Sequence, residues 1–75
     1  MYYYKRLRDL REDNDLLQKQ VADILNITRE QYQLYESGKR EIKVHQLIVL
    51  ADFYNVSVDY ILERTDISKY IHIAK

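Results

Sequence analysis

The sequence predicts a small all-α domain, and three observations support that class. One glycine and no proline occur in 75 residues, so the residues that make tight β turns and break helices are scarce. Apolar residues recur three and four positions apart, which is the spacing of amphipathic helices. A chain this short buries one modest core, which excludes a two-domain enzyme. The absence of cysteine excludes disulfides and thiolate metal sites, and is consistent with a reducing cytoplasm.

The first two helices are expected between residues 3 and 26. Apolar residues at i, i+4 and i+7 from Tyr3 share one face of the first helix, which ends near residue 14. Asp15 and Gln18 have capping-box spacing, so Asp15 is the expected start of the second helix. Asn26 tolerates the left-handed backbone and is expected to end it.

A third helix is expected after a very tight turn. Only Ile27 separates Asn26 from Thr28, and Thr28 is a good N-cap for a helix over residues 28–37. Gly38, the only glycine in the sequence, stops this helix. Two helices joined by so short a turn are the arrangement that presents one helix to the DNA major groove.

A fourth and a fifth helix complete a domain expected to span residues 1–65. The fourth begins at Val44 and ends at Asn55, and Ser57 caps the fifth. Residues 66–75 are less periodic and form a C-terminal extension. The expected core-facing residues of the fourth helix are Leu47, Ile48, Leu50, Ala51 and Tyr54.

The formal net charge is zero, with twelve basic and twelve acidic residues. This balance favours no class of partner, so any phosphate site must come from local placement of charge. No long apolar stretch opens the chain, so we expect no signal peptide, no membrane association and a cytoplasmic location.

An ordered set of residues resembles the Cro/C1-type (XRE) helix-turn-helix family of phage and bacterial repressors. The resemblance covers about residues 7–62. It implies a five-helix, lambda-repressor-like fold, with the second and third helices binding double-stranded DNA and a homodimer on a two-fold operator. The residues that carry it are Leu10-Arg11-Glu12, Gln18-x-x-Val21-Ala22, Asn26-Ile27-Thr28, Tyr32, Tyr35-Glu36-x-Gly38-Lys39 and Val56-Ser57-Val58.

Three positions depart from the family pattern. Leu17 stands where the family often has Ser or Thr, which puts the usual cap of the second helix in doubt. Ile42 stands where proline is common, and Phe53 where a small residue is common. The last departure suggests an added interface.

The third helix carries the expected base contacts: Arg29, Glu30, Gln33 and Leu34. With Ser37 they fall within an arc of about 140°, opposite Tyr32 and Tyr35, which are expected to pack inward. Arginine pairs with guanine, glutamine with adenine, and an apolar side chain with the thymine methyl. Glu30 either accepts from cytosine, excludes other sequences or neutralises Arg29. The alternative for the whole arc is a merely solvated helix face.

The expected phosphate contacts surround this helix. Gln18 lies at the start of the second helix, whose N-terminal amides reinforce an anion site. The alternative for the basic residues is a solvated charged loop. The full expected set is Gln18, Lys19, Ser37, Lys39, Arg40 and Lys43.

The resemblance also implies an ion pair between Arg11 and Glu36, which would tie the first helix to the end of the third. The alternative is two unrelated surface charges. Val49 and Phe53 are expected to point outward and, with apolar residues further on, to form a dimer interface. The alternative is a tail that folds back over Phe53. The residues expected at that interface are Val49, Phe53, Tyr60, Ile67, Tyr70 and Ile71.

No nucleophile–base arrangement, phosphate-binding glycine loop or metal motif occurs, so we expect neither an enzyme nor a cofactor or metal. The leading hypothesis is a sequence-specific DNA-binding transcriptional regulator. The alternative is a helix-turn-helix protein-interaction module, such as a toxin-binding antitoxin. Zero net charge, Glu30 and Phe53 favour that alternative.

Overall fold

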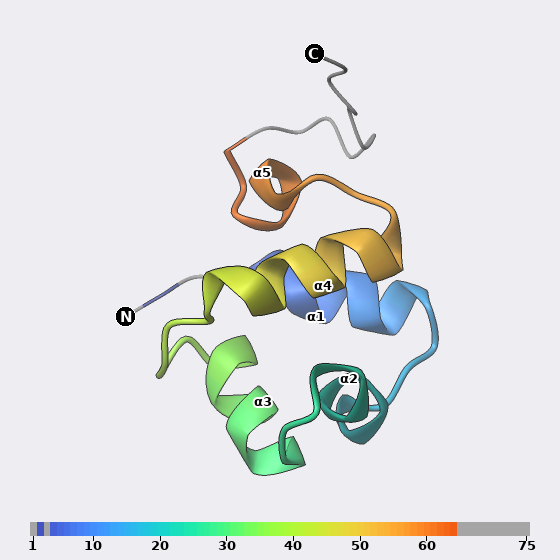
Figure 1. Cartoon of the computed structure of the whole chain (residues 1–75), viewed down its shortest axis with the longest axis vertical. Coiled ribbons are helices and arrows are strands. Elements are labelled where there is room, and N and C mark those ends of the chain that lie inside the picture. Colours follow the sequence, from blue (N-terminus) through green and yellow to red (C-terminus); the bar gives the residue numbers. More distant parts are fainter. Residues whose placement is uncertain (1, 3, 65–75) are drawn as a thin grey trace.

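The structure, a computed structural model, describes residues 2 and 4–64. Figure 1 shows α4 in front of α1, with α2 and α3 on one side of this pair and α5 on the other. The all-α class predicted from the sequence is confirmed. The helices of the described part are α1 (Lys5–Asp13), α2 (Gln18–Leu25), α3 (Arg29–Glu36), α4 (Val44–Tyr54) and α5 (Val58–Ile61).

Each helix contributes a side chain to the centre of the core. The largest fully buried side chains are Leu7, Val21, Tyr32, Leu50 and Ile61, one from each helix in chain order. Full burial of an apolar side chain of this size contributes roughly 1.5–3 kcal/mol. The buried side chain of Tyr32 therefore anchors α3 in the core that the five helices share.

The predicted helix ends at Asn26, Thr28, Asn55 and Ser57 are confirmed. Asn26 and Asn55 both have φ 58°, in the left-handed region where asparagine is tolerated. Thr28 Oγ1 accepts from the Gln31 N–H at 3.1 Å, and the Ser57 hydroxyl caps α5 in the same way.

The predicted start of α2 at Asp15 is wrong. Asp15 has φ 55°, and its N–H donates to the Glu12 carbonyl, so it belongs to the turn that ends α1. The N-cap of α2 is Leu17, whose side chain cannot accept a hydrogen bond. Instead the Gln20 side chain accepts from the Leu17 N–H at 2.7 Å. The first helix begins at Lys5, while Tyr3 lies outside the described residues.

The expected burial of Ile48 is also wrong. Leu47, Leu50 and Ala51 are buried and lie within an arc of about 100° on α4, and Ile48 falls outside this arc. Half of its surface is exposed as a result. Tyr54, on the same side as Leu50, is partly buried as expected.

Ile42 shows why this chain has no proline at that position. Its side chain is buried, and its backbone N–H donates to the hydroxyl of Tyr4 at 3.3 Å. Proline has no N–H to donate, so it could not make this contact. Tyr4 thus ties the start of the chain to the loop between α3 and α4.

Candidate nucleic-acid interface

The exposed face of α3 is polar, and its opposite face is anchored in the core. Tyr32 and Tyr35 are buried, whereas Arg29, Glu30 and Gln33 are exposed. The structure therefore places these three predicted base-contact residues on one solvent-facing surface. Leu34 is half-buried at its edge. This set of side chains can form hydrogen bonds with base edges in a groove.

Arg29 and Gln18 connect the starts of α3 and α2. Arg29 Nη1 donates to Gln18 Oε1 at 3.3 Å, and its guanidinium lies 3.6 Å from the Glu30 carboxylate. Gln18 Nε2 in turn donates to Glu36 Oε1 at 3.2 Å. The Gln18 side chain, expected to contact phosphate, is thus already engaged with two partners in the free protein.

Arg11 and Glu36, which the sequence pairs, are brought together beneath this surface. Arg11 Nε donates to Glu36 Oε2 at 2.7 Å, and the two side chains expose 13% and 2% of their surface. Arg11 also donates to the carbonyl of Leu16 at 2.9 Å. The sequence predicts this pair at the rim of the core, and the structure places it deeper. It joins α1, the loop before α2 and the end of α3.

The surroundings of Glu36 keep its carboxyl ionised. Burial alone would raise the pKa of this group, but the hydrogen bonds from Arg11 and Gln18 and the nearby Tyr32 hydroxyl outweigh that effect. The net result is a pKa below the ordinary value for glutamate. Glu36 therefore holds a negative charge inside the domain.

Two tyrosine hydroxyls complete the polar cluster around Glu36, and sequence reasoning missed both. Burial and then the Glu36 carboxylate raise the pKa of Tyr32, and burial raises the pKa of Tyr54 to about 12. Within the described residues, neither hydroxyl meets the full geometry of a hydrogen bond. The helical spacing of these tyrosines predicts burial, but it carries no signal for a shared carboxylate neighbour.

The predicted phosphate contacts fall into two groups. Lys19 lies 3.4 Å from Asp23, and the Ser37 hydroxyl donates to the Leu34 carbonyl at 3.3 Å, so both have partners within the domain. The second group lies around the loop that follows α3. Its members are exposed and, among the described residues, their side chains make no ion pair: Lys39, Arg40 and Lys43.

Backbone contacts hold the loop that carries these charges. The Lys39 and Arg40 N–H groups both donate to the Leu34 carbonyl, and the Tyr2 N–H donates to the Gly38 carbonyl at 3.0 Å. Gly38 has φ 78°, which glycine adopts without steric cost. The loop is thus fixed to both α3 and the start of the chain.

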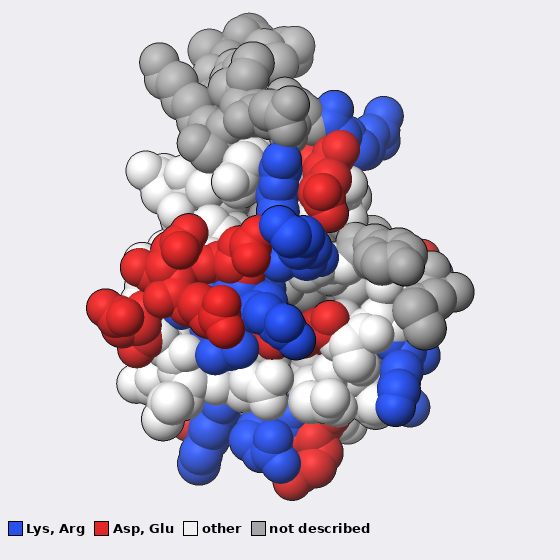
Figure 2. Space-filling view, turned by 180° about the vertical axis from the view of Figure 1, so that it is seen from behind, with Lys and Arg blue, Asp and Glu red and all other residues white. Residues whose placement is uncertain are grey.

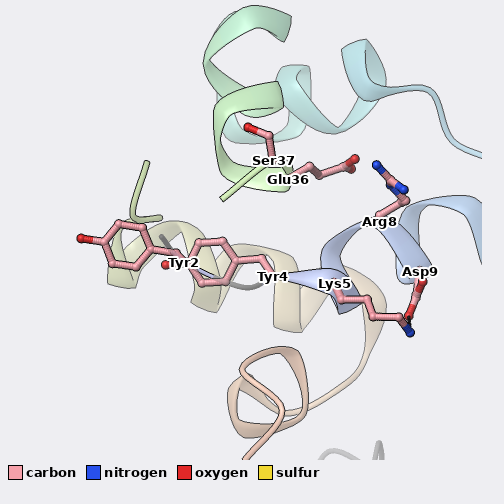
Figure 3. A pocket seen from close by; sticks show the side chains of 7 residues that line it. All are labelled: Tyr2, Tyr4, Lys5, Arg8, Asp9, Glu36 and Ser37. Carbon is pink, nitrogen blue, oxygen red and sulfur yellow. Dashed lines mark hydrogen bonds and ion pairs between the residues drawn. The ribbon is translucent and has the colours of Figure 1, made fainter. Parts of the chain in front are cut away.

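A pocket of about 410 Å³ lies between the start of α1 and the end of α3 (Figure 3). The rings of Tyr2 and Tyr4 stack along it with centroids 6.1 Å apart, and Tyr4 is buried. Lys5 pairs with Asp9 at 3.2 Å, and Figure 3 shows Arg8 extending toward Glu36. The pocket therefore borders the polar cluster from the side of α1.

Charge is unevenly distributed on the face where α1 lies. Figure 2 shows acidic side chains gathered on one flank of that face, beside a group of basic side chains. Among the described residues, no three His, Asp or Glu side chains are grouped to hold a metal ion. None of the described helices is both long and apolar enough to cross a membrane.

The expected dimer residues are only partly described. Val49 and Phe53 are exposed on α4, as expected. Tyr60 is partly buried, and the Arg6 guanidinium covers its ring at 4.1 Å from the centroid. Ile67, Tyr70 and Ile71, with the rest of the extension, lie outside the described residues.

A tight turn joins α2 to α3, and α3 is capped by Thr28, anchored in the core on one face and exposed on the other. This arrangement defines a helix-turn-helix protein. Residues 7–61 match the helix-turn-helix family. The chain belongs to the Cro/C1-type helix-turn-helix family.

Relatives with this domain are found in several bacteria. The chain is 41% identical over 64 residues to the uncharacterized HTH-type transcriptional regulator YobD of Bacillus subtilis, covering 85% of this chain and 57% of YobD. It is 37% identical over 65 residues to the HTH-type transcriptional regulator ImmR of Bacillus subtilis (87% and 51%). It is 34% identical over 56 residues to the cryptic phage CTXphi transcriptional repressor RstR of Vibrio cholerae (75% and 50%). The chain spans about half the length of these curated relatives.

A solved structure shares the fold. The crystal structure of a transcriptional regulator from Listeria innocua matches with a TM-score of 0.77 and 24% sequence identity, over 96% of this chain and 62% of that one. The arrangement of helices is thus one that a solved protein adopts.

Proposed function

We propose that this chain is a sequence-specific DNA-binding transcriptional regulator that places α3 in the major groove of a two-fold operator. The observation that carries the proposal is the exposed polar face of α3, with Arg29 and Gln33 on it and Tyr32 anchored beneath. The names of the relatives support it, since YobD and ImmR are called transcriptional regulators and RstR a transcriptional repressor. Such a regulator acts in the cytoplasm, where we place this one.

Arg29 and Gln33 are the proposed readers of guanine and adenine, and Leu34 of a thymine methyl. Glu30 lies 3.6 Å from the Arg29 guanidinium, which supports the hypothesis that it neutralises Arg29 in the free protein. On binding, Arg29 would exchange this exposed pairing, which contributes little, for a bidentate contact with guanine.

The proposed phosphate-binding groups are those that make no ion pair or side-chain hydrogen bond within the described part of the domain. Lys39, Arg40 and Lys43 are exposed beside α3, and the first N–H groups of α2 form an anion site at the helix start. We assign a weaker role to Lys19, because Asp23 competes for it. A neutral chain can bind DNA in this way because the basic groups lie next to the reading face.

Selection from random DNA duplexes tests this function, because it yields the site sequence, its symmetry and the half-site spacing together. Arg29→Ala and Gln33→Ala should each cost roughly 1–3 kcal/mol and relax preference at one position. Lys43→Ala should weaken binding to every sequence and reduce the salt slope by about one unit. An Arg29→Ala variant with unchanged affinity and preference would overturn this docking of α3.

A second candidate, a protein-interaction module of the toxin-binding kind, is favoured by the exposed apolar side chains of α4 and by Glu30. Retention on heparin or random duplex at low salt, lost steeply as salt rises, separates the two functions. No retention would favour the interaction module.

A further inference from the structure

The pocket between the start of α1 and the end of α3, which we call the α1–α3 pocket, has the size of a small-molecule site. Its volume of about 410 Å³ lies within the range of about 300–1,000 Å³ that is typical of such sites. It is bounded by Tyr2 and Tyr4 near the start of the chain, by Arg8 of α1 and by Ser37 after α3 (Figure 3). Apart from Ser37, none of these side chains belongs to the proposed DNA contacts.

Two tyrosine rings give the α1–α3 pocket an aromatic wall. The rings of Tyr2 and Tyr4 lie side by side in Figure 3, with an angle of 3° between their planes. Tyr4 is buried and its hydroxyl accepts from the Ile42 N–H, so this ring is held in place, whereas Tyr2 exposes 43% of its surface. Parallel rings of this kind offer a flat face on which another aromatic ring can stack.

Arg8 is the one charged side chain of this pocket that makes no hydrogen bond or ion pair among the described residues. Lys5 pairs with Asp9 at 3.2 Å. The Glu36 side chain pairs with Arg11 and exposes 2% of its surface. The exposed guanidinium of Arg8 is therefore the group left to bind a ligand, and its N–H groups match the two oxygens of a carboxylate.

We propose that the α1–α3 pocket binds a small aromatic carboxylate, whose ring stacks on Tyr2 and Tyr4 and whose carboxylate pairs with Arg8. One unpaired cation matches a single negative charge. A phosphate monoester carries a charge of about −1.5 to −2, so it would bring a second charge close to Glu36 with no cation to meet it. The charges therefore favour a carboxylate over a phosphate.

The α1–α3 pocket adjoins the loop that carries Lys39, Arg40 and Lys43. The Tyr2 N–H donates to the Gly38 carbonyl at 3.0 Å. A ligand on the Tyr2 ring therefore contacts the segment that fixes this loop. A regulatory role for that contact rests on the proposed function, whereas ligand binding itself does not.

An NMR titration of the full chain, without DNA, measures binding and locates it. The probe is 2-naphthoate, which should shift the amide signals of Tyr2, Arg8 and Ser37 to saturation. The dissociation constant should be on the order of 1 mM for so small a ligand in an open site.

Three matched probes separate the contributions of the ring and the charge. The compound 2-naphthamide keeps the rings without the charge, and cyclohexanecarboxylate keeps the charge without the aromatic ring. Each should bind about ten-fold more weakly than 2-naphthoate. The third probe, 2-naphthyl phosphate, carries the additional charge and should bind no more tightly than 2-naphthoate.

Substitutions test the two proposed contacts. Arg8→Gln removes the charge at an exposed position and should weaken 2-naphthoate binding about ten-fold. Arg64→Gln makes the same change at an exposed arginine that does not line the pocket, so it should leave the dissociation constant unchanged. Tyr2→Ala removes part of the aromatic wall and should weaken binding about three-fold or more, whereas Tyr2→Phe keeps the ring and should bind like the parent chain.

The proposal is overturned if 2-naphthamide binds as tightly as 2-naphthoate, or if Arg8→Gln and Arg64→Gln have the same effect. Shifts confined to α4 also overturn it, because the probe would then lie on exposed apolar side chains such as Ile48 and Phe53. No saturable shift up to about 10 mM probe contradicts the site, and tighter binding of 2-naphthyl phosphate contradicts the choice of a carboxylate. Since DNA is absent from every titration, failure of the proposed DNA binding would leave these results unchanged.

Discussion

Replacing Glu36 with glutamine should remove a large part of the stability of the domain. Its side chain exposes 2% of its surface and receives two hydrogen bonds from Arg11, at 2.7 and 3.3 Å. Glu36→Gln keeps the size of the side chain but removes the buried counter-charge of Arg11, whose side chain exposes only 13% of its surface; the carboxylate that remains, that of the exposed Glu12, lies 4.0 Å away. Breaking a buried pair in this way costs about 3–5 kcal/mol. That is much of the free energy of unfolding expected for a domain of this size.

Urea unfolding followed by circular dichroism measures the effect. With a slope of about 1 kcal/mol per molar urea, typical of very small domains, the midpoint should fall by roughly 3 M or more. Glu41→Gln removes the same charge from an exposed residue and should shift the midpoint little. Equal, small shifts for the two variants would refute the reasoning.

A double variant shows whether the cost comes from the stranded charge. Arg11→Met with Glu36→Gln removes both charges, so it should cost less than the sum of the two single variants. Additive costs would mean that each side chain acts independently, through packing alone.

Three further predictions follow from local geometry. Folding lowers the pKa of the Glu36 carboxyl, so its ionised form adds to the free energy of unfolding. This contribution is complete above about pH 4.3, the pKa of glutamate in the unfolded chain, and is lost as the pH falls below that value. The gap in unfolding free energy between the parent chain and Glu36→Gln should therefore narrow below that pH, and a constant gap would contradict the assigned shift. Tyr4→Phe leaves the buried Ile42 N–H without an acceptor and should cost about 1–3 kcal/mol by denaturant titration, unlike a change at exposed Tyr2. Asn26→Ala should lower the melting temperature more than Asn26→Gly, because φ is 58° there; the reverse order would count against this backbone assignment.

The sequence predicts those parts of the fold that local chemistry determines. Asn26, Thr28 and Ser57 end or start helices through their own backbone preference or their own hydroxyl, so their roles can be predicted from sequence. The start of α2 could not be predicted from sequence, because it depends on the left-handed turn that the chain makes at Asp15 after α1 ends. The position of Ile48 likewise depends on which arc of α4 the rest of the domain covers.

The candidate site divides in the same way. Helical spacing predicts which residues of α3 face outward and that Tyr32 and Tyr35 face inward. Spacing says nothing of the contact between Gln18 and Glu36, which lie eighteen positions apart and meet only when α2 packs on α3. The expectation that Gln18 reserves its side chain for phosphate missed this contact.

The contacts of Gln18 join the stability of the domain to its proposed reading of DNA. The same carboxylate that pairs with Arg11 accepts from Gln18, and Gln18 accepts from Arg29 on the reading face. A glutamine at position 36 has one acceptor oxygen in place of two, and the charged Arg11 is the stronger competitor for it. Gln18, which orients Arg29, therefore loses its acceptor, in addition to the loss of stability in the core. It follows that Glu36→Gln should weaken preference for the base read by Arg29 even at temperatures where the variant is fully folded. Glu41→Gln, which touches none of these groups, should not.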